Sequence, residues 1–165
     1  MSSTPRLGLP FLSTGQAQKE IFHNEALQTL DTLVVPAVEE PARTAPPASP
    51  VAGACYILDA APTDDWAGKP HHLAAFTAAG WRFISPQDGM TCYVRSEAAW
   101  TLYRNGEWKV GEVLGSALVL AGQQVVGPRL GAIAAPTDGS VVDAEARLAL
   151  GQILTALRQH GLIGA

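Results

Sequence analysis

Apolar residues recur at helical spacing close to the start of the chain. The stretch 14–33, TGQAQKEIFHNEALQTLDTL, alternates short apolar and polar groups along its length. This pattern predicts an amphipathic helix of about five turns, which ends before Pro36 because a proline cannot continue a helix. The face expected to be buried consists of Ala17, Ile21, Ala26, Leu27, Leu30, Leu33 and Val34.

Extended segments are expected on both sides of this helix. Residues 1–12 contain Pro5 and Pro10 among leucines at alternating positions, which predicts an arm that lays apolar side chains on a neighbour. Residues 36–53, PAVEEPARTAPPASPVAG, are rich in proline and predict an extended linker of polyproline character. The sequence therefore predicts an N-terminal docking segment, residues 1–35, joined by this linker to a separate body.

The body, residues 54–112, alternates apolar and polar positions in short runs that turn residues separate. Turns are expected at Ala79-Gly80 and Asn105-Gly106. Asn-Gly between such runs is a strong hairpin signal, because a type I′ turn needs positive φ at both central residues. We expect a small antiparallel β-domain, either a sandwich or a barrel. With a helix at each end of the chain, the fold class is α+β.

Two further segments complete the chain. Residues 113–142 are rich in Gly, Ala and Val and too interrupted for a long helix, so short strands or an extended strip packed on a neighbour are expected. Residues 143–165 predict a helix that Asp143 caps at its start and Gly161 ends.

The C-terminal helix carries apolar residues at coiled-coil spacing. Leu at one core position and Ile at the next favours three or more strands over two in parallel bundles. We expect this helix to self-associate, with a trimer favoured and a pentamer as the alternative. Packing of the helix on its own domain stays open. The oligomerisation positions are Ala146, Leu150, Ile153 and Leu157.

Charge and composition limit the kinds of partner that we expect for this chain. The formal net charge is -4, which gives no general electrostatic reason to bind nucleic acid. No apolar run is long enough for a membrane span or a signal peptide. We therefore expect that the protein is made in the cytoplasm and does not insert into a membrane. Two cysteines in such a chain are expected to be reduced thiols.

The sequence lacks the motifs that are typical of catalytic and metal-binding sites. There is no nucleophile motif, phosphate loop or zinc-type spacing; His71 and His72 are expected in a loop, and His23 lacks a second histidine at ligand spacing. We therefore expect no enzyme activity, no cofactor and no metal. The polar face of the N-terminal helix is interpreted as a docking or subunit interface formed by Gln16, Gln18, Lys19, His23 and Asn24.

Aromatic residues concentrate within residues 66–108. Most should form the core of a small β-domain, because burying large rings contributes much of its stability. A flat aromatic platform that stacks on sugar rings is the alternative, with Trp66 or Trp100 facing a glycan.

Several separated motifs resemble one family. They are TPRLGLPFL, GQAQKE and HNEAL within residues 4–31, PPASP at 46–50, Tyr56-Ile57, WAG at 66–68 and WRF at 81–83. The N-terminal stretch resembles the opening of proteins found in prophages and gene-transfer-agent clusters of Alphaproteobacteria, and the later motifs recur in the same order. The tail also resembles phage fibre and spike endings that finish in a short self-associating helix.

The resemblance implies a context. It implies a structural component of a phage-like particle, such as a head spike, fibre or tail-tip protein, that is made in the cytoplasm and released with the particle. Other structural proteins of the particle would be partners, and cell-surface polysaccharide is a further one. A carbohydrate-binding module that recognises host capsular polysaccharide is the alternative function.

Overall fold

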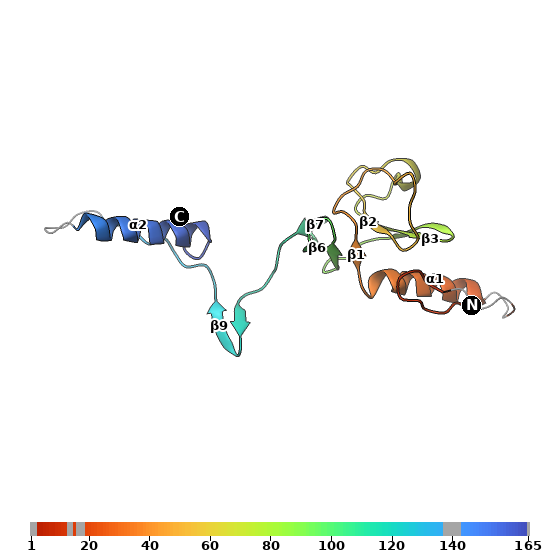
Figure 1. The fold of residues 1–165 in the computed structure, drawn as a ribbon, viewed down its shortest axis with the longest axis horizontal. Helices are drawn as coiled ribbons and strands as arrows, with labels where there is room; N and C mark the ends of the chain where they lie inside the picture. The colour runs from red at the N-terminus through yellow and green to blue at the C-terminus, as the bar shows by residue number, and fades with distance from the viewer. Residues whose placement is uncertain (1–2, 13–14, 16–18, 137–142, 165) are drawn as a thin grey trace. The chain divides into compact units, whose positions relative to one another are not determined.

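The structure is α+β, with helices and small, mostly antiparallel sheets (Figure 1). The chain divides into two compact units, Met1–Glu112 and Val113–Ala165. The computed structural model describes residues 3–12, 15, 19–136 and 143–164.

The first unit contains one α-helix and two sheets in its described part. One sheet has the strand order β1-β5-β6-β7, and the other has the order β2-β3-β4. Strand β1 runs parallel to β5, and the other neighbours are antiparallel. The elements are α1 (Lys19–Leu33), β1 (Ala37–Val38), β2 (Cys55–Ile57), the 3₁₀ turn η1 (Asp64–Trp66), β3 (Leu73–Thr77), β4 (Gly80–Ile84), β5 (Thr91–Val94), β6 (Ala99–Arg104) and β7 (Glu107–Val110).

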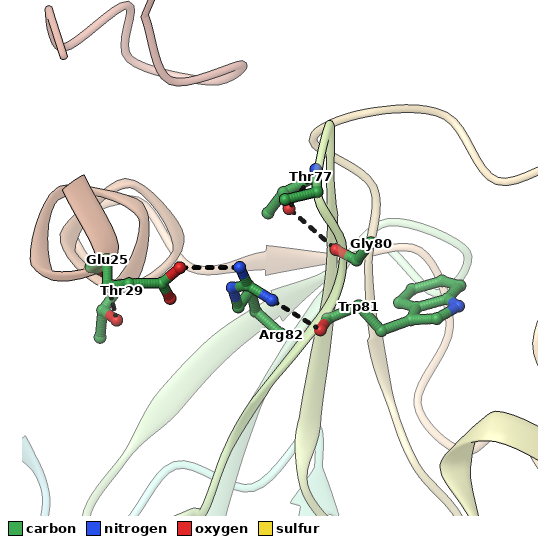
Figure 2. Close-up of polar contacts among 7 residues, drawn as sticks. Glu25, Thr29, Thr77, Gly80, Trp81 and Arg82 are labelled. Atoms are coloured by element: carbon green, nitrogen blue, oxygen red, sulfur yellow. Dashed lines mark hydrogen bonds and ion pairs between the residues drawn. The ribbon is translucent and has the colours of Figure 1, made fainter. Parts of the chain in front are cut away.

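Both expected hairpins are confirmed. The turn between β6 and β7 has positive φ at Asn105 (51°) and Gly106 (82°), as a type I′ turn requires. The turn between β3 and β4 is held by the Thr77 hydroxyl, which donates to the carbonyl oxygen of Gly80 at 2.8 Å (Figure 2).

The main core lies between the two sheets. Both sheets contribute buried side chains to one cluster, and Leu33 from the end of α1 packs against it. Its buried members alternate along their strands, as side chains on one face of a sheet must. They are Val38, Cys55, Ile57, Leu73, Ala75, Cys92 and Val94.

A second cluster covers the opposite face of the β2-β3-β4 sheet. The turn η1 places Trp66 there with 0% of its surface exposed, 5.0 Å from the ring of Trp81 and 5.7 Å from that of Tyr56. This sheet is therefore covered on both faces, which explains why all of β2 is buried. Trp66 is a core residue and not the glycan platform that the sequence left open.

Residues 36–53 differ from the expected linker. Val38 is buried in the main core, and β1 pairs with β5 in the register Ala37↔Tyr93. Further along, the Arg43 N–H donates to the carbonyl oxygen of Ile57 at 2.9 Å, so the segment joins the two sheets. The prolines allow this because Pro36 needs to supply only its carbonyl oxygen, which accepts the Tyr93 N–H at 2.7 Å.

The buried and exposed faces of α1 are also reversed from expectation. Asp31 and Thr32 are its buried residues. The side chain of Phe22 is 81% exposed, and Ile21, Leu30 and Val34 are exposed as well. Other polar residues, Glu20, Asn24 and Gln28, are half-buried on the inner side. The predicted apolar stripe therefore points largely outward; Ala17 lies outside the described residues.

The second unit contains a hairpin and a helix in its described part. Its elements are β8 (Leu118–Leu120), β9 (Gln123–Val126) and α2 (Ala144–Gln159). Both predicted caps of α2 are confirmed: the Asp143 carboxylate accepts the Ala146 N–H at 2.9 Å, and Gly161 has φ +71°. The Leu162 N–H reaches back to the carbonyl oxygen of Leu157 at 2.9 Å, which closes the helix end.

Candidate functional site

The N-terminal arm lies against the inner, polar face of α1 (Figure 1). The Asp31 carboxylate accepts the Thr4 hydroxyl at 2.7 Å, the Arg6 N–H at 3.1 Å and the Leu7 N–H at 2.6 Å. A buried carboxylate with three donors is well compensated for its loss of water. The polar face of the helix is therefore occupied by the arm of the same chain.

Arg6 fixes the other end of this contact. Its guanidinium donates to the carbonyl oxygens of Thr32 at 3.2 Å, Val35 at 2.8 Å and Ala37 at 3.2 Å. A cation at the C-terminal end of a helix interacts favourably with the helix dipole and satisfies carbonyls without an intrahelical partner. Arg6 thus ties the arm, the end of α1 and the start of β1 together.

Asn24 also serves contacts within the chain. Its amide oxygen accepts the Leu12 N–H at 3.0 Å, and its amide nitrogen donates to the Leu12 carbonyl oxygen at 3.2 Å. Asn24 is half-buried and uses its amide within its own chain, and its part in a docking surface stays a prediction. The sequence signal that could have shown the inner face is the spacing of Glu20, Asn24, Gln28 and Asp31, which share one side of a helix.

An ion pair connects α1 to the β2-β3-β4 sheet. The Arg82 guanidinium on β4 lies 2.7 Å from the Glu25 carboxylate, while Trp81 points to the opposite face of the strand (Figure 2). Both partners are partly exposed, so the pair contributes about 1 kcal/mol at most. Its main role is orientation: α1 presents one face to the sheet and the other to solvent.

Lys19 and His23 are the predicted docking residues that lie exposed in the structure. They flank the outward-facing apolar residues of α1 at helical spacing, so the exposed side combines apolar groups with two basic residues. Gln16 and Gln18 lie outside the described residues.

We name the exposed apolar side of α1, with the nearby tryptophan of β6, the outer apolar face. A hollow of about 550 Å³ lies at the C-terminal end of α1, between this end of the helix and strands β5 and β6. Trp100 lines this hollow, is 57% exposed and packs edge-to-face on Tyr93 at 5.7 Å. Sequence periodicity predicted Ala26, Leu30 and Val34 as one apolar stripe, but as a buried one. The outer apolar face consists of Phe22, Ala26, Leu30, Val34 and Trp100.

The chain also matches a family model. Residues 23–109 match the model described as "Protein of unknown function (DUF2793)". The chain belongs to the DUF2793 family. No curated protein and no solved structure matches the chain.

The DUF2793 match runs from α1 to β7. It includes Asp31, the Glu25–Arg82 pair and Trp100, but neither the arm nor the second unit. The region common to the DUF2793 family is therefore the two-sheet body with most of its helix, and the outer apolar face is built largely on that region.

The predicted oligomerisation positions lie on α2. Ala146, Leu150 and Ile153 are exposed, and Leu157 is half-buried. Leu154, between them, is instead the buried residue of the helix. The seam at coiled-coil spacing is thus left without a partner from the described part of its own chain.

The described residues also bear on metal binding, thiol chemistry and membrane spanning. They contain no group of three or more His, Cys, Asp or Glu placed to hold a metal ion. Cys55 and Cys92 are free thiols, and burial raises the pKa of each to about 12, so both stay protonated at neutral pH. No helix in the described ranges is long and apolar enough to cross a membrane.

Proposed function

We propose that the protein is a homo-oligomeric structural component of a phage-like particle, such as a head spike, fibre or tail-tip protein. It takes part in particle assembly and in attachment to the host cell surface. The observation that carries this proposal is the amount of apolar surface that each unit leaves exposed. Its context comes from the N-terminal motifs that resemble prophage and gene-transfer-agent proteins.

The first unit provides the docking surface. In α1, Asp31 and Asn24 hold the arm on the inner side, and Phe22, Leu30 and Val34 are exposed on the other side. Contiguous exposed apolar surface of this kind usually marks a protein interface. The partner that fits is another structural protein of the particle, with acidic groups opposite Lys19 and His23. A two-sheet body, of the sandwich or barrel type, carries this helix.

The second unit provides self-association. Its helix α2 leaves Leu150 48% and Ile153 55% exposed, and burying the exposed part of each side chain between copies stabilises an oligomer by about 1 kcal/mol. Leu and Ile at alternating core positions favour three or more strands over two. Among such oligomers we favour a trimer, with a pentamer as the alternative if the protein sits at a fivefold vertex of the capsid.

The docking proposal is tested in a strain that produces the particles. Phe22 and Leu30 are both replaced with Ser in the full chain, and incorporation into purified particles is measured by immunoblot. The matched control is Val51→Ser, which changes an exposed apolar residue away from the outer apolar face. We expect the double variant to fold but to be lost from particles, while the control is retained. Normal incorporation of the double variant would refute docking through this face.

Self-association is tested separately with the purified chain. Light scattering at micromolar concentration should give the mass of a trimer or pentamer. A monomer of 17.3 kDa would refute the homo-oligomer.

One observation favours the alternative, a carbohydrate-binding module. Trp100 is exposed and braced by Tyr93, and an aromatic face held in this way can stack on a sugar ring. Under this alternative, Trp100→Ala abolishes retention on immobilised host capsular polysaccharide while the oligomer stays intact. Equal retention of the variant and the wild type would dispose of the glycan site.

A further inference from the structure

The β8–β9 hairpin is exposed on both of its faces. Every residue of both strands is exposed, although most are aliphatic. Leu118 pairs with Val126 and Leu120 pairs with Gln123, with a register shift between Leu118 and Val119. Because successive side chains of a strand point to opposite faces, the apolar run Leu118–Leu120 places apolar groups on both faces. Apolar side chains on both faces are typical of strands that are buried on both faces.

The backbone edges of the hairpin are also unpaired. Its sheet has the order β8-β9, and no third strand joins it within the described residues. An isolated two-stranded hairpin is marginally stable at best in water. Exposed edges are normally protected by charges, yet no charged residue lies between Glu112 and Arg129. The hairpin therefore lacks both a core and the usual protection of its edges.

The rest of the second unit cannot supply that core. Among its described residues, only Leu154 and Ile163 are buried apolar side chains. A unit this small needs far more buried apolar surface, or a partner, to be stable. The exposed large apolar residues of the unit are Val113, Leu114, Leu118, Val119, Leu120, Val125, Val126, Leu130, Ile133, Leu148, Leu150, Ile153 and Leu162.

Hydrogen bonds join the segment that follows the hairpin to the residues after α2. The Leu130 N–H donates to the carbonyl oxygen of Leu162 at 3.1 Å, and the Gly164 N–H donates to that of Leu130 at 2.7 Å. Leu130 follows the end of β9 by four residues, a span of about 14 Å at most. Copies of the chain that associate through α2 therefore hold their hairpins close to one another.

We infer that the β8–β9 hairpin is completed by the same hairpin from neighbouring copies of this chain, as an intermolecular β-structure next to the associated helices. This inference rests on the proposed homo-oligomer and names a second contact within it. A second copy fits better than an unrelated partner, because the α2 seam and the hairpin belong to one unit and are joined by the Leu130 contacts. Proximity raises the effective concentration of each hairpin for its neighbours.

The first test replaces Leu120 with Lys in the full chain. In a hairpin that stays exposed, this change is nearly neutral. Between copies, it buries an unpaired charge, so we expect the oligomer to dissociate about 100-fold more readily in sedimentation or light scattering. Val51→Lys is the matched control and should leave the oligomer unchanged. All four tryptophans lie within residues 66–108, so their fluorescence shows that the first unit stays folded.

The second test is cross-linking. Val119→Cys should give disulfide-linked chains under mild oxidation, whereas Val51→Cys should not, and the native cysteines are buried. Cross-linking of Val119→Cys together with dissociation of the Leu120 variant supports the inference. An oligomer that neither cross-links at position 119 nor weakens with Leu120→Lys overturns the inference but leaves the proposed function standing. A monomeric wild-type chain overturns both.

Discussion

The hydroxyl group of Thr4 donates a hydrogen bond to the carboxylate of Asp31 at 2.7 Å, and both residues are buried. They are 27 positions apart in the sequence. Because Asp31 also accepts two backbone N–H groups from the arm, one side chain determines which face of α1 is turned inward. The direction of the outer apolar face follows from this contact.

Replacing Asp31 with Ala should destabilise the first unit. The change leaves the Thr4 hydroxyl and the N–H groups of Arg6 and Leu7 without an acceptor, at a cost of about 2–4 kcal/mol in the free energy of unfolding. Urea titration followed by tryptophan fluorescence measures this cost. Asp31→Asn keeps one acceptor oxygen and should lose less. A change below about 0.5 kcal/mol for Asp31→Ala would show that the arm does not depend on this contact.

The orientation of α1 predicts unequal effects along the helix. Phe22→Ser should change the free energy of unfolding by less than about 0.5 kcal/mol, because the ring is already in solvent. Leu33→Ala should cost about 2 kcal/mol or more, since Leu33 packs against the main core. Thermal or urea unfolding of the two variants compares them directly. A larger loss for Phe22→Ser would mean that the helix is turned the other way.

Signals confined to a few neighbouring residues predicted the structure well. Asn105-Gly106 forms the expected turn because its geometry depends only on its own backbone angles. Asp143 caps the start of α2 and Gly161 follows its last turn, as predicted, because the hydrogen bonds of each cap form within one turn of the helix.

Signals that depend on distant parts of the chain were misread. The apolar spacing of α1 predicted a buried stripe, but the arm brings backbone donors to the polar side and requires Asp31 and Asn24 there. The prolines of residues 36–53 predicted a linker, yet the short run between Pro36 and Pro41 is enough for β1 to pair with β5. Neither outcome can be read from local composition, because the partner strand or arm lies far away in the sequence.

The tryptophans should separate into core and surface residues. Trp66→Ala removes a fully buried ring that contacts Tyr56 and Trp81, and should cost about 3–5 kcal/mol. Trp100→Ala should cost much less, because its ring is largely exposed. Acrylamide quenching of the native protein provides the second measurement. We expect Trp100→Phe to remove much of the tryptophan fluorescence that acrylamide can quench. Unchanged quenching in this variant would mean that Trp100 is buried.

The buried thiols predict how stability changes at alkaline pH. Burial raises the pKa of Cys55 and of Cys92 from an ordinary value of 9.0 to about 12 in the folded chain. Below pH 9 both thiols are protonated in the folded and in the unfolded chain, so they do not make the free energy of unfolding depend on pH. Above pH 9 the unfolded chain loses these protons first, so stability falls by up to about 1.4 kcal/mol per pH unit for each thiol until pH 12.

Urea titrations between pH 8 and pH 11 measure this loss. The double variant with Cys55→Ala and Cys92→Ala is the control and should show a shallower fall with rising pH. The same slope in the variant and in the wild type would show that other groups cause the alkaline loss. Native thiols should also react slowly with a thiol reagent at pH 8, at a rate that rises when urea opens the core.

The division of the chain predicts that residues 1–112 fold alone. This fragment contains both buried clusters of the first unit. It also contains the hydrogen bonds that Asp31 accepts from the arm and the Glu25–Arg82 ion pair. Its melting curve, followed by tryptophan fluorescence, should therefore match that of the full chain closely. Because self-association is assigned to the second unit, size-exclusion chromatography should give a monomer for the fragment at concentrations where the full chain is an oligomer. An unfolded fragment would mean that the second unit stabilises the first, and an oligomeric fragment would move the main self-association contact to the first unit.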